Sequence, residues 1–145
     1  MLLTGTFPRV IDDKFRIAIP KQFRSVLAGT PEAFVYVAPG TDGSLAIYSE
    51  AAFQALADRL AQASQADPQV RGYSRMFYAK AQTVELDSQG RIRVSTELAQ
   101  LAGLVKDVLL VGVRDHLELW DKQRWEAYLS DKQSRFDELA ESALK

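Results

Sequence analysis

The sequence predicts a mainly β protein with short helices, an α+β chain built from two similar half-units. The first observation behind this prediction is a repeated motif: an aspartate precedes an arginine by four positions in Asp12–Arg16 and again, 75 positions later, in Asp87–Arg91. The second is that short alternating apolar runs, turn residues and helix caps recur in the same order around both motifs. Half-units of this size cannot bury their apolar faces separately, so we expect one shared core.

The first motif lies between two short apolar runs. Alternation predicts strands at 7–11 and 16–19. The stretch Asp12–Phe15 between them has turn character, so the strands and the turn are expected to form a short hairpin. Pro20 has a fixed backbone angle suited to the first turn of a helix, and Gly29 would end that helix.

A second hairpin and a longer helix complete the first half. The apolar run at 34–38 predicts a buried strand, the dense turn residues at 39–43 predict a turn, and 45–48 returns as a strand. Ser49 is a good N-cap for a helix whose apolar residues follow at helical spacing. After a polar loop at 62–68, a further helix over 70–79 is expected to join the halves.

The second half repeats this order. Its expected elements are a strand at 82–86, a turn at 87–90, a strand at 91–94, a helix from Ser95 to Gly103, a strand at 108–113, a turn at 114–115, a strand at 117–120 and a helix after Asp121. The offset between equivalent positions falls from 75 to 72, which predicts a three-residue deletion opposite the turn at 39–43. The tail, 130–145, is expected to be either a loose amphipathic helix or a frayed end.

These elements divide the chain into four parts. The expected divisions are a first unit at 5–52, a helical connector at 53–80, a second unit at 81–124 and a C-terminal helix or tail at 125–145.

Composition argues against enzymatic chemistry. The 145-residue chain has no cysteine, which excludes disulfides and thiolate metal sites, and a zinc site would need mostly carboxylates beside the single histidine, His116. No Gly-rich phosphate loop or nucleophile elbow is present. We therefore predict a protein that is not an enzyme and that needs no metal or cofactor, and we interpret His116 as a surface residue beside a turn.

The expected location is the cytoplasm. The stretch Met1–Gly5 lacks the charged start and the long apolar core of a signal peptide, and no apolar run approaches the length of a membrane span. The absence of cysteine fits a reducing compartment. No membrane partner is expected.

The charge pattern points to a local nucleic-acid contact. The net charge is −1, which argues against diffuse electrostatic binding, but five basic residues face two acidic ones between Arg9 and Arg24. The guanidinium fork of arginine suits bidentate contacts with guanine edges or phosphates. Two motif arginines related by internal symmetry could meet DNA on one face. The candidate DNA contacts are Arg16 and Arg91, flanked by Lys14, Arg9, Lys21, Arg24 and Arg93, with Asp12 and Asp87 stabilising the turns.

With the strand, turn and cap pattern around them, the two motifs resemble the tandem SpoVT-AbrB units of the MraZ family of bacterial transcriptional regulators. The resemblance is carried by Asp12–Pro20, Asp87–Arg91, Val108–Val113, Leu119–Asp121 and Arg124–Glu126. It implies a single-chain version of the swapped-hairpin β-barrel that AbrB-type DNA binders form as dimers, with a pseudo-twofold axis between the halves.

The resemblance also implies a function. Proteins of this family bind double-stranded DNA at short repeated promoter elements upstream of the division and cell wall gene cluster, assemble into homo-oligomeric rings, and associate with the nucleoid. The expected function is therefore a sequence-specific regulator, a repressor of that cluster including its own promoter, with Arg16 and Arg91 as DNA contacts.

The first motif departs from the family pattern, because Phe15 stands where glycine is usual. Phenylalanine resists the positive backbone angles that glycine allows, so either the first turn is reshaped or Phe15 packs against a neighbour. Ser95 replaces a common proline in the second unit and can cap the helix equally well.

Two alternatives from other classes stay open at this stage. One is an AbrB-like antitoxin that captures a partner protein through its C-terminal helix, which predicts a small toxin gene next door. The other is a ring-forming interaction scaffold without DNA binding, which a gel shift against the upstream promoter fragment would distinguish.

Overall fold

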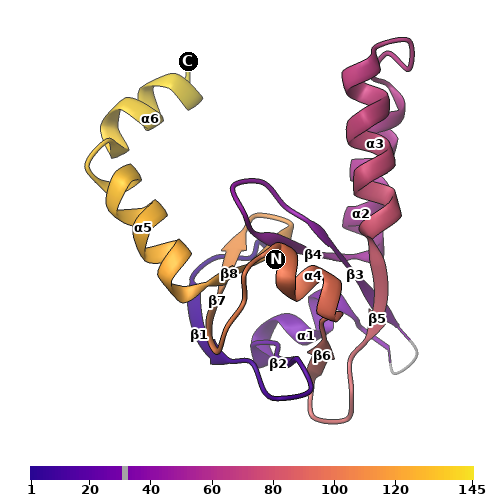
Figure 1. The fold of residues 1–145 in the computed structure, drawn as a ribbon, viewed down its shortest axis with the longest axis vertical. Coiled ribbons are helices and arrows are strands. Elements are labelled where there is room, and N and C mark those ends of the chain that lie inside the picture. Colours follow the sequence, from indigo (N-terminus) through magenta and orange to yellow (C-terminus); the bar gives the residue numbers. More distant parts are fainter. Residues whose placement is uncertain (31–32) are drawn as a thin grey trace.

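The computed structural model describes residues 1–30 and 33–145 and shows an α+β fold (Figure 1). The α+β class agrees with the prediction, but the chain is not mainly β with short helices, because three of the described helices have 12 or 13 residues. The elements in chain order are β1 Thr6–Val10, β2 Arg16–Ala18, α1 Lys21–Leu27, β3 Phe34–Pro39, β4 Leu45–Ser49, α2 Glu50–Ala61, α3 Pro68–Lys80, β5 Gln82–Glu85, β6 Arg91–Arg93, α4 Thr96–Leu101, β7 Asp107–Val113, β8 His116–Asp121, α5 Lys122–Gln133 and α6 Phe136–Ala143. The tail is therefore helical over most of its length. Across the described residues, no helix combines the length and apolarity that crossing a bilayer requires.

The strands form two antiparallel sheets in which the halves interleave. The larger sheet has the order β1-β7-β8-β4-β3-β5, and β2 pairs only with β6 in a separate two-stranded ribbon. The first strand of each half joins the other half, because β1 pairs with β7 and β5 pairs with β3. Each half thus completes the sheet of the other.

The predicted hairpin between the first two strands is wrong. The turn itself is present, since the amide of Asp12 donates to the carbonyl of Arg16 at 3.2 Å. Beyond the turn the strands separate into different sheets, where β1 pairs with β7 and β2 with β6. Pairing β2 with β6 places Ile17 opposite Ile92, and both side chains are fully buried in the core shared by the halves. That burial is the physical reason for the exchange, since a local hairpin would leave each isoleucine with only its own half.

The three-residue deletion lies where the offset predicts it. Residues 40–44 connect β3 to β4, whereas only residues 114–115 connect β7 to β8. After these turns the halves stay in register, because α2 and α5 are both 12 residues long and begin 72 positions apart. Both helices begin as predicted at a side-chain cap, Ser49 for α2 and Asp121 for α5.

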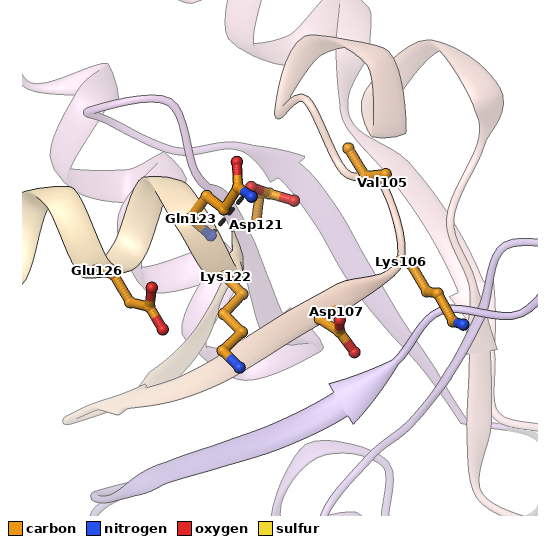
Figure 2. A pocket seen from close by; sticks show the side chains of 7 residues that line it. All are labelled: Val105, Lys106, Asp107, Asp121, Lys122, Gln123 and Glu126. Atoms are coloured by element: carbon orange, nitrogen blue, oxygen red, sulfur yellow. Dashed lines mark hydrogen bonds between the residues drawn. The ribbon is translucent and has the colours of Figure 1, made fainter.

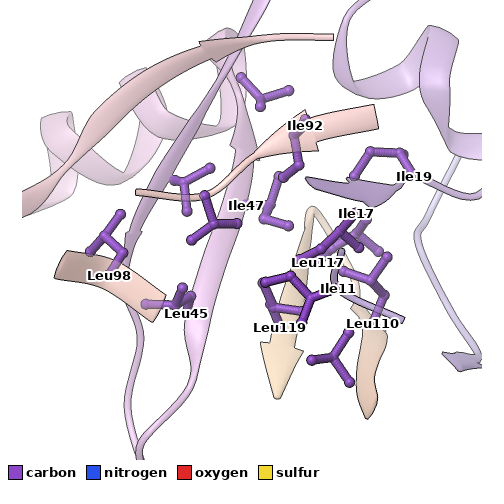
Figure 3. Close-up of a cluster of buried hydrophobic side chains, with 14 of the residues drawn as sticks. Ile11, Ile17, Ile19, Leu45, Ile47, Ile92, Leu98, Leu110, Leu117 and Leu119 are labelled. Carbon is purple, nitrogen blue, oxygen red and sulfur yellow. The ribbon is translucent and has the colours of Figure 1, made fainter. Parts of the chain in front are cut away.

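One apolar cluster lies between the sheets and joins both halves (Figure 3). Its fully buried members include Ile17 and Ile92 from the ribbon and Leu117 and Leu119 from β8. Burying one side chain of this size stabilises a fold by about 1.5–3 kcal/mol. The ribbon is therefore fixed to the body of the protein through its two isoleucines.

Two helical arms leave the sheets on the side away from the motif loops (Figure 1). The arm of α2 and α3 stands on an aromatic cluster in which the rings of Tyr36 and Phe53 stack at 3.9 Å between centroids. The arm of α5 and α6 begins beside Trp120, which is buried and contacts Trp125 edge-on at 5.3 Å. The two tryptophans therefore pack against each other within the protein. The loops at 12–16 and 87–91 lie at the opposite end.

Candidate nucleic-acid interface

In the first motif loop, the carboxylate of Asp12 holds the turn and the arginine together. Its Oδ1 accepts hydrogen bonds from the backbone amides of Lys14 at 3.0 Å and Arg16 at 2.8 Å. Its Oδ2 accepts from Nε of Arg16 at 2.7 Å. A short polar side chain that accepts amides two residues on is the usual way aspartate closes a turn. Here the same carboxylate also sets the direction of the guanidinium.

The second motif loop repeats this arrangement. Oδ1 of Asp87 accepts from the amides of Gln89 and Arg91, both at 2.9 Å, and Oδ2 accepts from Nε of Arg91 at 2.8 Å. The amide of Gly90 donates to the carbonyl of Asp87, as the amide of Phe15 does to Asp12. The two loops are therefore structurally equivalent, bond for bond, at these positions.

These bonds lower the pKa of both aspartates below the ordinary value of 3.8, chiefly through the backbone amides of Arg16 and Arg91 and further through their side chains. A carboxylate with a lowered pKa in the folded state stabilises the fold above its ordinary pKa. That contribution is lost as the pH falls through the lowered value. The hydrogen bonds of both aspartates therefore contribute to the stability of the loops at neutral pH.

In an Arg16→Ala variant we expect the pKa of Asp12 to rise only part of the way to its ordinary value, because the amide bonds that are the larger cause remain. The pKa of Asp87 should not move, which makes it an internal control. Carboxyl chemical shifts measured during an NMR pH titration test this. A full return of the Asp12 pKa to its ordinary value would contradict the dominant role of the backbone.

Phe15 does not reshape the first loop. It adopts a left-handed backbone with φ of 58°, close to the 76° of its counterpart Gly90, and its ring packs against the main apolar cluster. For a residue with a Cβ this conformation costs about 1–2 kcal/mol. The buried ring surface is the available compensation. Of the two outcomes that the sequence left open, packing against neighbours is therefore the one observed.

The second loop places a different group at the equivalent place. A Cβ added to Gly90 would overlap the guanidinium of Arg24, which extends from α1 and donates from Nε to the carbonyl of Ile19 at 3.1 Å. The residue 75 positions on from Arg24 is the small, buried Ala99. The second loop thus pairs its small residue, Gly90, with the large Arg24 of a helix. The first loop has the large Phe15, and the helix residue equivalent to Arg24 is the small Ala99.

We expect Gly90→Ala to destabilise the fold by about 1–2 kcal/mol from its positive φ alone, with a further loss because Arg24 must leave its place. Removing the guanidinium first, in an Arg24→Ala background, should make the same substitution less costly. Urea unfolding of the four proteins in this double-mutant cycle measures the coupling. Equal costs in both backgrounds would mean that Gly90 and Arg24 do not compete for space.

The β2–β6 ribbon turns one face to the core and the other outward. Side chains alternate across a strand, so burial of Ile17 and Ile92 directs their neighbours away from the core. The register places Arg16 opposite Arg93 and Ala18 opposite Arg91. Like charges directly opposite each other destabilise a strand pair, so stability of the ribbon does not explain the first of these pairs. An anionic partner lying on this outward face would explain why two arginines are placed opposite each other.

The other predicted contact residues divide into two groups. Lys14 and Lys21 are exposed, in the first loop and at the start of α1. Arg9 and Arg24 are half-buried, and each uses its Nε on a backbone carbonyl, that of Ala18 at 3.0 Å for Arg9. Arg9 and Arg24 are therefore partly occupied in holding the ribbon, a role that the sequence did not reveal.

His116 and the acidic residues do not form a metal site in the part of the chain that the structure describes. Groups of three or more histidine, cysteine or acidic residues placed to hold a metal ion are absent there. His116 is not the surface residue that was predicted: its side chain is only 18% exposed, because its ring packs on Tyr48 and its Nδ1 lies 2.8 Å from Oδ1 of Asp115. It lies in β8 and not in the motif loops.

A surface hollow of about 410 Å³ between β7 and α5 has lining residues of both charge signs (Figure 2). Asp121 within it is already engaged, since its Oδ2 accepts the backbone amide of Gln123 at 3.2 Å to cap α5.

Comparison with known proteins shows the family of this chain. A family model described as "MraZ protein, putative antitoxin-like" matches the chain twice, over residues 2–76 and 77–145. Proteins named "Transcriptional regulator MraZ" from Nocardia farcinica, Rhodococcus opacus and Mycobacterium tuberculosis are 38%, 37% and 36% identical to it. Each comparison covers 99% of this chain and 97% of the relative. The repeated match and the full-length similarity show that this chain belongs to the MraZ family.

Proposed function

We propose that the outward face of the β2–β6 ribbon is the surface through which this chain, a DNA-binding transcriptional regulator and not an enzyme, contacts double-stranded DNA. One observation supports this above the others. The register of the ribbon gathers Arg16, Arg91 and Arg93 on the face opposite the buried isoleucines. A two-stranded ribbon is one of the elements that the major groove admits.

The aspartates prepare the arginines for this contact. Each carboxylate binds Nε of its arginine, and among the described residues no protein group accepts a hydrogen bond from the Nη atoms of Arg16 or Arg91. The Nη donors can therefore form a bidentate pair with a guanine edge or a phosphate. Fixing the guanidinium before binding reduces the entropy lost on binding.

The homo-oligomeric ring remains part of the proposal. With a net charge of −1 and few cations on the ribbon, one protomer would bind a single site weakly. A ring on repeated promoter elements would engage several ribbons at once and raise the effective concentration. Both arms expose apolar side chains suited to subunit contacts, among them Met76 at 63% and Phe136 at 69%. The exchange of β1 and β5 between halves likewise supports a swapped-hairpin barrel.

The promoter is the third part of the proposal. We infer that the chain represses the division and cell wall gene cluster, including its own promoter, and that it acts in the cytoplasm in association with the nucleoid. The support is the family membership and the resemblance of the two motifs.

A gel shift of the wild-type protein on its own upstream promoter fragment tests the proposed function. We expect retardation of that fragment at concentrations that leave a shuffled duplex of equal length and composition unbound. The difference should persist at two salt concentrations, because base contacts do not depend on counterion release as phosphate contacts do. Equal binding of both duplexes, or of neither, would contradict sequence-specific regulation.

The antitoxin alternative has one observation in its favour, the words "antitoxin-like" in the description of the matching family. In that reading the exposed apolar face of α6, with Phe136 and Leu139, would capture a partner protein. Co-purification of the product of an adjacent small gene, lost with Phe136→Asp and unaffected by Arg16→Ala, would favour it. Division and cell wall genes next to this gene would argue against it.

A further inference from the structure

The two halves of the outward ribbon face are equivalent in backbone but not in charge. The register relates Arg16 to Arg91 by a pseudo-twofold axis that passes between Ile17 and Ile92. Under the same relation Ala18 corresponds to Arg93, and Lys14 corresponds to Gln89. At two equivalent positions, therefore, one half has a cation and the other has a neutral side chain.

The register gathers these differences at one end of the ribbon. Arg93 lies directly opposite Arg16, so the end next to the first loop has Lys14, Arg16 and Arg93. The end next to the second loop has Arg91 opposite the uncharged Ala18. The first loop also carries Asp13 where the second has Ser88, and the first-loop end still has one more positive charge among these equivalent positions.

Two further arginines lie near the ribbon, but they are less available to DNA than the cations at the first-loop end. Arg9 and Arg24 act at the second-loop end, where Arg9 donates to the carbonyl of Ala18 and Arg24 covers Gly90. Each has its Nε bound to a backbone carbonyl. Lys14 and Arg93, by contrast, are exposed, and within the described part of the chain their side chains donate no hydrogen bond to the protein. The first-loop end thus has two exposed cations without a protein partner, whereas the additional arginines at the second-loop end are half-buried and partly bound.

We propose that this uneven face makes a protomer bind its DNA element in a single orientation, with Arg93 as the main determinant and the first-loop end making more phosphate contacts than the second. An evenly charged pseudo-twofold face would bind an element equally well either way round. Different side chains at equivalent positions make the two orientations unequal in free energy. The inference rests on the proposed function and adds the polarity of its contact with DNA.

A tethered cleavage reagent tests the orientation directly. Because the chain has no cysteine, Asp13→Cys and Ser88→Cys each create a unique attachment point, at equivalent exposed tips of the two loops. Each variant is coupled to an iron chelate that cuts DNA. It is then bound to a duplex with one copy of the DNA element, which footprinting of the unmodified protein on its promoter fragment first locates. We expect each probe to cut one flank only, and the two probes to cut opposite flanks. Equal cutting of both flanks by both probes would overturn the inference.

Two opposite substitutions test the role of Arg93. Arg93→Ala should reduce the slope of log affinity against log salt by about one and spread cutting to the second flank. Ala18→Arg should steepen the slope by about one and spread the cutting as well, because both ends would then carry the same arginine pair. Unchanged slopes and cutting in both variants would overturn the role of Arg93. If a probe prevents binding, the salt slopes of the unlabelled variants decide alone.

The proposed function fails separately from this inference. If the unmodified protein does not retard its promoter fragment, the proposed function is wrong, and so is the inference that the protomer binds DNA in one orientation. If the unmodified protein binds and both probes cut both flanks, only the polarity is wrong.

Discussion

The Arg16→Ala/Arg91→Ala double variant is expected to lose specific promoter binding while keeping its fold. Both guanidinium groups lie on the outward face of the ribbon with their Nη atoms directed to no protein acceptor in the described chain. A bidentate arginine contact contributes about 1–3 kcal/mol, so each loss should weaken binding by about tenfold or more. Gel shifts at two salt concentrations measure the affinity and its salt slope, and circular dichroism checks the fold.

Arg59→Ala is the control for each of the two substitutions, since it likewise removes one positive charge, from an exposed position on α2 in the arm that leaves the sheets away from the loops. It should bind as the wild type does. Wild-type affinity and salt slope in the double variant would show that the ribbon is not the contact surface. An equal loss in Arg59→Ala would show that overall charge, and not the position of the arginines, governs binding.

Ile92→Ala is expected to destabilise the protein by about 2–5 kcal/mol, the range for removing buried aliphatic groups that leave a cavity. Ile92 is fully buried, and its packing in the main apolar cluster, together with that of Ile17, fixes the ribbon to the core. Urea unfolding measures the change, and Ile17→Ala should give a similar value because the two positions are equivalent. The ribbon should also lose order, so DNA affinity should fall with stability.

Val10→Ala serves as the control, because Val10 is 57% exposed on the edge strand β1. Its removal should change the free energy of unfolding by less than about 0.5 kcal/mol, as for most surface substitutions. A cost for Ile92→Ala as small as this would mean that the ribbon does not depend on the shared core.

Much of the fold follows from alternation and capping, but the partners of the strands do not. The apolar pattern correctly predicted the strands that contain Ile17 and Ile92 and located the shortened turn at 114–115. It also predicted a local hairpin that the structure lacks. Alternation fixes which face of a strand is apolar but says nothing about which strand lies beside it. A three-residue strand can pair either with its neighbour in sequence or with its symmetric counterpart.

The candidate site was predictable to a similar extent. Internal symmetry alone predicted that Arg16 and Arg91 share a face, and the turn chemistry of aspartate predicted their partners. The position of Arg93 opposite Arg16 could not be predicted, because it depends on the β2–β6 register. The contact of Arg24 with Gly90 is equally invisible in sequence, since it joins α1 of one half to the loop of the other.

Hydrogen exchange of the wild-type protein with and without its promoter fragment tests the central claim most directly. If DNA lies on the ribbon, amide exchange should slow at 12–18 and 87–93, the two loops and their strands. Exchange in α2 and α3 should not change on adding DNA, because this arm leaves the sheets on the side away from the motif loops. Slowing confined to α2 and α3, with the ribbon unaffected, would contradict the assignment of the DNA contact to Arg16 and Arg91.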